Sequence, residues 1–381
     1  MVFNFSSADI SMAYRQLHKI PEPEFKEFRT SEFIWDFLSK SGLKPVKCAG
    51  TGIYADIAGK PGKKKILFRA DIDALPISEE SGVEFASENP GYMHACGHDM
   101  HTACLLFAAK TLNDNKDKFC GTVRVLFQPA EEGSGGALPM INEGAAEGVT
   151  AAFAMHVEPL ESVGTILYKD GGIMASPDDY KILIKGRGGH GAEPEKCINP
   201  ITAAAKLISR YNKIKEVYFS NTQCVTTVCT VNSGTMNNII PDTLEMTGTA
   251  RSFDAETRAK LKKLLEFYAE KTAGEFGADV EFTYNELYPP TISDSLMNEV
   301  VIKSALETEG ITQIKELEKG SMTGDDFAYF TQLVPSSYFK LGVGGKGNRY
   351  PLHSAKFRID EKALMIGCRL FVNIACRYLS E

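Results

Sequence analysis

The sequence predicts an α/β protein with a discontinuous outer domain and a smaller domain inserted into it. Strand and helix patterns alternate along the first part of the chain, which is typical of a layered sheet covered by helices. After about residue 177 the order becomes β-α-β-β-α-β, which describes a ferredoxin-like unit. We therefore expect an outer domain over residues 1–177 and 293–381, with a mixed, mainly parallel sheet flanked by helices, and an inserted α+β domain over residues 178–292.

The outer domain is expected to begin with one or two amphipathic helices over residues 11–40, interrupted by two prolines. Four strands should follow, over residues 51–59, 63–76, 122–133 and 151–157. The second of these is almost continuously apolar up to Asp71, which indicates a strand buried on both faces of a sheet. A helix over residues 102–112 separates it from the third strand, and an apolar helix over residues 361–380 closes the domain.

The inserted domain is expected to hold four strands, over residues 179–189, 223–234, 242–253 and 279–290. Its first helix should span residues 199–214, because Asn199 and Pro200 are residue types that start a helix. Its second helix should span residues 254–277, with Asp254 as the N-cap.

The charge and cysteine content exclude several classes of protein. The chain has 42 Lys and Arg against 49 Asp and Glu, a net charge of −7, which disfavours a general nucleic-acid binder. No apolar run approaches the ~18–20 residues that cross a bilayer. The nine cysteines form no C-x-x-C pair, which disfavours zinc ribbons and disulfide frameworks. Since the N-terminus also lacks a signal-peptide pattern, we expect a cytoplasmic protein that binds neither nucleic acid nor a membrane.

The segment HACGHDMHTA, residues 94–103, is the strongest local signal of chemistry. It places Cys96, His98, Asp99 and His101 within six positions, in a chain with only seven histidines. Thiolate, imidazole and carboxylate are common ligands of zinc and similar divalent ions. A single loop histidine is usually a packing residue, but this density predicts a metal site.

Other candidate groups follow separate buried strands. Glu131 and Glu132 come after an apolar strand, where a solvated turn is the alternative to a metal ligand beside a general base. His156 and His353 stand near strand ends, and Asp71 and Asp73 end another strand. Together with Glu131 and Glu132, these residues make six candidate groups at strand ends. Because function gathers beyond the carboxyl ends of strands in open α/β sheets, we expect a buried metal centre there.

Two rival interpretations remain at this point. Residues 186–191 fit the G-x-G-x-x-G pattern, but a dinucleotide site would need a helix to open immediately. These glycines are better explained as a tight turn that presents His190, itself either structural or functional. Cys96 near histidines also allows a cysteine nucleophile, although the Glu-Glu pair would then have no role.

In their order along the chain, these motifs resemble the M20 metallopeptidase family, specifically its amidohydrolase branch of aminoacylases, hippurate hydrolases, N-acetyl-diaminopimelate deacetylases and auxin-conjugate hydrolases. The resemblance covers nearly the whole chain and is carried by RQLHKIPEPEFKEFRTSEFI, RADIDALPI, MHACGHDMHTA, LFQPAEEGSGGA, AMHVEP, GRGGHGAEP, NIIPD, GTARSFD, GDDFAYF and PLHSAKF. It implies an enzyme that cleaves the amide bond of N-acyl amino acids, or similar small conjugates, to a carboxylic acid and a free amino acid.

The resemblance also implies two divalent ions per subunit, which would be Mn, Zn, Ni or Co. The implied metal ligands are Cys96, His98, Glu132, His156 and His353. Cys96 would bridge the ions, and Glu131 would be the general base acting on a water that the metals bridge. Asp71 would be the second active-site acid, with Asp73 as the competing assignment.

The inserted domain resembles the family's lid, which is also its dimer interface, so the resemblance implies a homodimer. His190 would act on the substrate in its own or the partner's site, and Asn238 and Arg251 would bind substrate. The chain departs from the family pattern at Glu195 and at Asp325, which could alter substrate preference. The non-enzyme alternative is an inactive, metal-dependent binding protein for amino-acid conjugates.

Overall fold

The computed structural model describes residues 5–345 and 349–380, and its contacts divide the chain into two compact units. The large unit comprises Met1–Gly171, Ile292–Glu318 and Asp326–Glu381, and the small unit comprises Gly172–Thr291 and Lys319–Asp325. The expected domain ranges differ most from these units at residues 319–325: the sequence placed them in the outer domain, but the structure groups them with the small unit. The backbone amide of Ala175 lies 3.0 Å from both Ser321 O and Thr323 O, a contact between residues far apart in the chain.

The large unit is built on an eight-stranded mixed sheet with the order β1-β2-β4-β3-β5-β16-β6-β15. Its strands are β1 (Val46–Cys48), β2 (Gly52–Ala58), β3 (Lys60–Asp71), β4 (Cys120–Gln128), β5 (Ala151–Ser162), β6 (Thr165–Tyr168), β15 (Gln313–Glu316) and β16 (Ser336–Gly344). The four central strands, β4, β3, β5 and β16, run parallel to one another. Parallel strands need crossover connections, which helices provide here.

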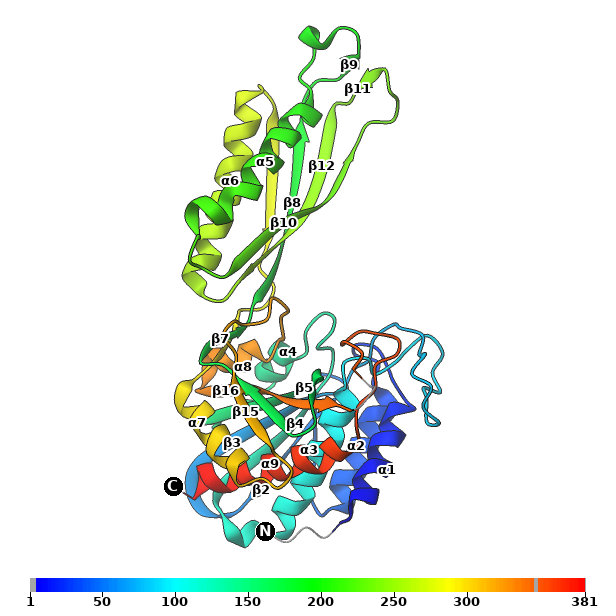
Figure 1. Ribbon diagram of the computed structural model, residues 1–381, viewed down its shortest axis with the longest axis vertical. Helices are drawn as coiled ribbons and strands as arrows, with labels where there is room; N and C mark the ends of the chain where they lie inside the picture. The colour runs from blue at the N-terminus through cyan, green and yellow to red at the C-terminus, as the bar shows by residue number, and fades with distance from the viewer. Residues whose placement is uncertain (1–4, 346–348, 381) are drawn as a thin grey trace. The chain divides into compact units, whose positions relative to one another are not determined.

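The helices of the large unit are α1 (Ser7–His18), α2 (Phe28–Lys40), α3 (His98–Asp114), α4 (Ala137–Asn142), α7 (Ser295–Leu306), α8 (Ala328–Leu333) and α9 (Lys362–Leu379). Helix α3 is buried along almost its whole length, and it packs against α9 and α1 (Figure 1). Side chains of α1, α2, α3, α7 and α9 share one core with the central strands. The short helices α4 and α8 contact each other and lie on the side of the sheet away from α9 (Figure 1).

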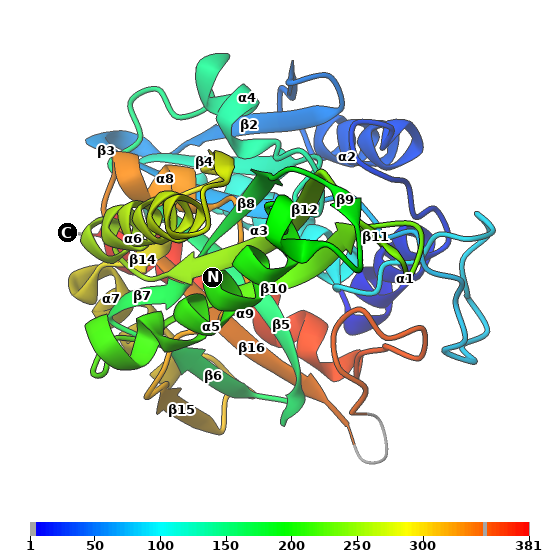
Figure 2. The ribbon, with the colours of Figure 1, turned by 90° about the horizontal axis from the view of Figure 1, so that it is seen from above.

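The small unit has the expected β-α-β-β-α-β order. Its sheet has the order β10-β12-β8-β13, and every neighbouring pair is antiparallel. The elements are β8 (Ser176–Lys185), α5 (Pro200–Tyr218), β10 (Cys224–Ser233), β12 (Thr243–Ser252), α6 (Ala255–Glu275) and β13 (Asp279–Asn285). Helices α5 and α6 lie side by side on one face of this sheet (Figures 1 and 2).

Local sequence explains where these two helices begin. The side chain of Asn199 accepts a hydrogen bond from Ile201 N, and that of Asp254 accepts one from Thr257 N, so both expected caps are formed. Short strands β9 (Gly189–His190) and β11 (Ile239–Ile240) pair with each other, while β7 (Gly171–Met174) and β14 (Thr291–Ser293) lie where the chain passes between the units. The predicted fold class, a helix-flanked mixed sheet with an inserted ferredoxin-like unit, is confirmed.

Across the described ranges, no helix combines the length and the apolar character needed to cross a bilayer.

Candidate metal centre

The central strands bring the candidate groups of the large unit to one edge of the sheet. Strand β3 ends at Asp71, and β4 ends three residues before Glu131. Parallel strands end at the same edge, so the segments that leave β3 and β4 meet there. Helix α3 begins at His98, and His156 lies on β5, the other neighbour of β3.

The five expected ligands form two groups that share one residue. In the first group, ligand atoms of Cys96, His98 and His156 all lie within 4.8 Å of one another, and all three residues are buried. In the second group the same limit holds for Cys96, Glu132 and His353, which are respectively buried, half-buried and exposed. Cys96 therefore belongs to both groups.

Hydrogen bonds orient the two buried histidines of the first group. His98 Nδ1 lies 2.9 Å from Asp73 O, and His156 Nδ1 lies 2.8 Å from Val157 O. Each carbonyl can accept only if the Nδ1 atom carries the proton, which leaves the Nε2 atom with its lone pair. His98 Nε2 is buried and has no hydrogen-bond partner among the described residues, and His156 Nε2 lies 3.5 Å from Cys96 Sγ.

The electrostatics of these residues would suit a bound cation. Burial raises the pKa of the Cys96 thiol well above its usual range, and Glu132 and Glu131 raise it further. Burial alone would lower the pKa of His98, but Asp71 and neighbouring carboxylates raise it to about 10. A divalent cation would reverse both tendencies, since it stabilises a thiolate and displaces a proton from imidazole. The donor set of sulfur, nitrogen and oxygen atoms fits zinc, cobalt, nickel and manganese.

Glu131 and Glu132 stand side by side at the same place. Ligand atoms of His98, Glu131 and Glu132 lie within 4.8 Å of one another, and Glu131 is only 7% exposed. Glu132 Oε1 lies 3.1 Å from His353 Nε2 and 3.9 Å from His98 Nε2, so it reaches both ligand groups. The solvated-turn interpretation of this pair does not fit the burial.

The two aspartates that follow β3 have different partners. Asp71 lies 2.6 Å from His101 Nδ1 and 2.5 Å from Arg69 Nη1, so charged and polar groups already occupy its carboxylate. Asp73 accepts a hydrogen bond from Glu132 N at 2.9 Å, and its Oδ1 lies 3.3 Å from His98 Nδ1. Asp73 therefore touches a ligand imidazole and the backbone of a ligand carboxylate.

Two further buried residues lie at this site outside the implied ligand set: His101, which the histidine-rich segment already included, and Glu27, which the sequence did not single out. His101 accepts a hydrogen bond from Val157 N at 3.0 Å, and its ring centroid lies 4.8 Å from that of His156. Its place in the histidine-rich segment was the available signal. Glu27, in the PEPEFKE sequence, is fully buried and binds Ala130 N, next to Glu131; no local pattern separates it from the neighbouring acids.

His18 is buried and contacts two carboxylates, one of them in the first turn of α3. Its Nδ1 lies 2.6 Å from Asp99 Oδ2, its Nε2 lies 3.1 Å from Glu79 Oε1, and its side chain is 2% exposed. Burial alone would lower the pKa of His18, but the hydrogen bonds to Asp99 and Glu79 raise it to about 9. His18 therefore links the end of α1 to the first turn of α3.

This raised pKa predicts a loss of stability in alkali. A proton bound more tightly in the folded state stabilises it fully below the ordinary pKa of 6.5, and that stabilisation is lost as the pH rises through about 9. We expect the free energy of unfolding to fall by on the order of 2–3 kcal/mol more in the wild type than in His18→Gln over this range. Denaturant titrations at matched metal concentration measure it, and equal pH slopes in the two proteins would contradict the assignment.

In the small unit, two of the three expected substrate residues lie together. His190 is exposed on β9 and pairs with Ile239, and Gly191 N donates to Asn238 O at 2.8 Å. Arg251 lies near the end of β12, opposite Val225 and Pro177. Eight residues of strand separate it from Thr243, which is roughly 25 Å. No helix opens immediately after the glycines at 186–191: the short 3-10 helix Pro194–Lys196 comes first and α5 begins only at Pro200, which disfavours a dinucleotide site.

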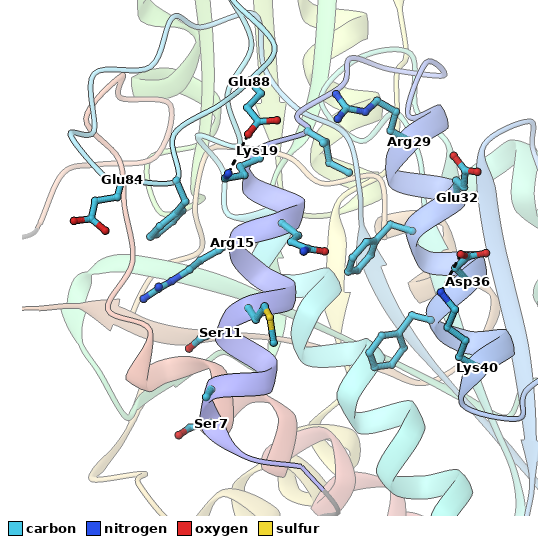
Figure 3. Close-up of a pocket in the computed structure, with 17 residues that line it drawn as sticks. Ser7, Ser11, Arg15, Lys19, Arg29, Glu32, Asp36, Lys40, Glu84 and Glu88 are labelled. Atoms are coloured by element: carbon cyan, nitrogen blue, oxygen red, sulfur yellow. Dashed lines mark hydrogen bonds and ion pairs between the residues drawn. The ribbon is translucent and has the colours of Figure 1, made fainter.

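A separate cleft of about 1300 Å³ lies between α1, α2 and residues 84–88 (Figure 3). Its acidic and basic side chains include the pairs Lys19–Glu88 and Lys40–Asp36 (Figure 3). None of the expected ligands or catalytic residues lines it. This cleft is therefore separate from the two ligand groups.

Comparison with known proteins identifies the family that this sequence and fold resemble. Residues 67–377 match the peptidase family M20/M25/M40. The chain is 36% identical over 375 residues to thermostable carboxypeptidase 1 of Saccharolobus solfataricus, covering 96% of this chain and 94% of that protein. It is 37% identical over 370 residues to the N-acetyl-L-cysteine deacetylase of Bacillus subtilis, covering 96% and 87%. The crystal structure of a dinuclear metal binding peptidase of family M20 from Bacillus subtilis superposes with a TM-score of 0.88, at 34% identity, covering 98% of each chain.

Proposed function

Because this chain belongs to the peptidase family M20/M25/M40 and is a hydrolase of that family, we propose that it is a metal-dependent amidohydrolase for N-acyl amino acids or similar small conjugates. The family and the enzyme class expected from the motifs are confirmed. The observation that carries the proposal is the pair of ligand groups that share Cys96, with Glu131 beside them.

In this proposal two divalent ions, of Mn, Zn, Ni or Co, would be held by Cys96, His98, Glu132, His156 and His353. When bound, such ions lower the pKa of water and polarise a carbonyl group. Glu131 takes the proton from the attacking water and later gives it to the departing amine. Asp73 lies 3.3 Å from His98 Nδ1 and accepts from the backbone of Glu132, whereas Asp71 fixes His101 and has Oδ2 3.7 Å from His98 Nε2, so both aspartates lie beside the ligand set. We prefer Asp73 as the second active-site acid, because Arg69 already pairs with Asp71.

The small unit supplies the remaining part of the proposal as a lid. His190 accepts a hydrogen bond from Ala192 N at its Nδ1 atom, so the neutral ring carries its proton on Nε2, where it can donate to a substrate oxygen. Asn238 lies beside it. Arg251 offers a cation for the substrate carboxylate but lies roughly 25 Å further along β12. One small substrate would not contact Arg251 and His190 of the same protomer, so we propose that His190 acts in the partner's site. We also propose a homodimer through this unit, supported by the exposed apolar side chains of Val231 and Ile239. Sedimentation of the intact protein measures its oligomeric state.

The cysteine-nucleophile alternative is disfavoured by the surroundings of Cys96. Burial raises the pKa of its thiol, and burial also lowers the pKa of His156 well below its usual value. Without a cation the two groups therefore stay neutral, and a neutral thiol is a poor nucleophile. A reducing, cytoplasmic location remains part of the proposal and is consistent with the buried free thiols of Cys48, Cys96, Cys104, Cys224 and Cys368.

Metal removal and a substrate panel test the function. We expect the protein to release free amino acid from N-acetyl and N-benzoyl amino acids, to lose this activity in excess EDTA, and to regain it with manganese, zinc, nickel or cobalt. Dipeptides with a free C-terminus form the parallel panel, since one relative is named a carboxypeptidase and another a deacetylase.

Three outcomes would contradict the proposal in different ways. Tight binding of the conjugates without turnover would favour an inactive binding protein. Activity that resists the chelator but is lost on thiol alkylation would favour the cysteine nucleophile. Faster turnover of dipeptides than of every N-acyl amino acid would move the substrate class to peptides.

A further inference from the structure

Four carboxylates hold the backbone of the segment that carries Glu131 and Glu132. This segment, residues 130–137, connects β4 to α4 and is called the Glu131 loop below. Its amide-to-carboxylate hydrogen bonds are Ala130 N to Glu27 at 3.0 Å, Glu132 N to Asp73 at 2.9 Å, Ser134 N to Glu24 at 2.6 Å and Ala137 N to Asp326 at 2.9 Å. Two of these four acids, Glu24 and Glu27, come from the PEPEFKE sequence, to which the proposed reaction gives no role.

The backbone conformation and close packing of the loop restrict the position of Glu131. Ala130 has φ of 57°, in the left-handed region that residues with a Cβ rarely adopt. A Cβ added at Gly133 would lie 2.0 Å from Glu24 Oε2, and one added at Gly136 would lie 2.0 Å from Pro129 O. A strained residue persists where its surroundings over-determine it, and here the surroundings are these carboxylates.

Glu27 is the member placed directly before Glu131. It is fully buried; Oε1 accepts from Ala130 N and Phe25 N, both at 3.0 Å, and Oε2 accepts from Thr51 Oγ1 at 2.6 Å. Phe25, like Ala130, has a positive φ, of 52°. Burial raises the pKa of Glu27 to about 7, with the hydrogen bonds opposing it, so a carboxylate here is costly. A single oxygen, Oε1, therefore holds the amides of two left-handed residues, while Oε2 is held by Thr51.

We propose that residues 24–27 are a positioning element for the general base, in which Glu27 holds Ala130 and so fixes where the Glu131 carboxylate points. This inference rests on the proposed role of Glu131. Glu27 belongs to neither ligand group, so it acts through the loop and is a positioning residue. Displacing a reacting group by about 1 Å can cost roughly 100-fold in rate, which sets the scale of the effect.

The test compares Glu27→Ala with Glu27→Gln and with a matched variant, Glu22→Ala. Glu22 is another buried carboxylate of the PEPEFKE sequence. It accepts hydrogen bonds from Arg29 N, Thr30 N and Thr30 Oγ1, none of which belongs to the Glu131 loop. We expect Glu27→Ala to lower kcat roughly 10- to 100-fold with KM within about twofold and the metal content unchanged. Glu27→Gln should keep kcat within about threefold, because its amide oxygen can accept both backbone protons.

Amide hydrogen exchange provides a readout that does not depend on activity. Peptides covering residues 129–137 should exchange their amide hydrogens faster in Glu27→Ala than in the wild type. In Glu22→Ala their exchange rates should equal those of the wild type. The proposal is overturned if Glu27→Ala keeps normal kcat, if Glu22→Ala loses kcat equally, or if exchange in the loop is the same in all variants. If the wild type hydrolyses none of the amides, the proposed function fails, and exchange still decides whether Glu27 holds the loop.

Discussion

Replacing Glu131 by Gln should lower kcat by roughly 10²- to 10⁴-fold and leave the metal content of the protein unchanged. The side chain keeps its size and its place on the loop but can no longer take a proton from water. Both three-residue ligand groups that contain Cys96 exclude Glu131, so its loss removes no donor from them. Steady-state kinetics on an N-acetyl amino acid, with metal analysis of the same sample, measure both quantities.

The adjacent residue provides the matched control. Glu132→Gln makes the same chemical change one position later, but Glu132 belongs to the group with Cys96 and His353. We expect this variant to lose metal, and excess metal in the assay to restore part of its activity. Glu131→Gln should show no such restoration. Near-normal turnover by Glu131→Gln, or a loss of metal equal to that of Glu132→Gln, would contradict the assignment of the general base.

Replacing Cys96 by Ala should have the second large effect, the loss of metal from both ligand groups. Cys96 is the residue that these two groups share, and it is only 7% exposed. Metal affinity should fall by at least roughly 100-fold, the upper end of the loss seen when a group supporting a ligand is removed. The rise in thermal stability that added metal gives the wild type should be much smaller in the variant.

A second buried cysteine separates this effect from simple loss of packing. Cys104 lies on α3, fully buried, with its Sγ atom 3.3 Å from Leu364 O. Cys104→Ala should lower stability but keep the full metal content and activity. A Cys96→Ala protein that still binds two ions would contradict the shared-ligand assignment, and if it were also inactive it would favour the nucleophile alternative.

The sequence predicted those features that depend on local patterns. The caps at Asn199 and Asp254 are where the side-chain chemistry indicated, and the apolar run that ends at Asp71 is a central parallel strand. The helix expected over residues 102–112 is longer and begins at His98, because Gly97, with φ of 82°, turns the chain directly into it. Strand ends thus indicated the edge of the sheet at which the candidate ligands lie together.

Features that depend on distant contacts were not predictable from one sequence. The grouping of residues 319–325 with the small unit rests on hydrogen bonds such as those of Ala175, more than 140 positions away in the chain. The choice between Asp71 and Asp73 depends on which one a buried arginine occupies. Glu27 and Glu24 differ from ordinary surface acids only through the loop amides that they meet after folding.

Anomalous diffraction from crystals of the metal-reconstituted protein tests the central claim most directly. Data collected on either side of the absorption edge of the added metal locate each ion independently of any assumed ligand. We predict two peaks, one bounded by Cys96, His98 and His156 and the other by Cys96, Glu132 and His353, with Glu131 facing the space between them. A single ion elsewhere, or ions bound without Cys96, would contradict this account.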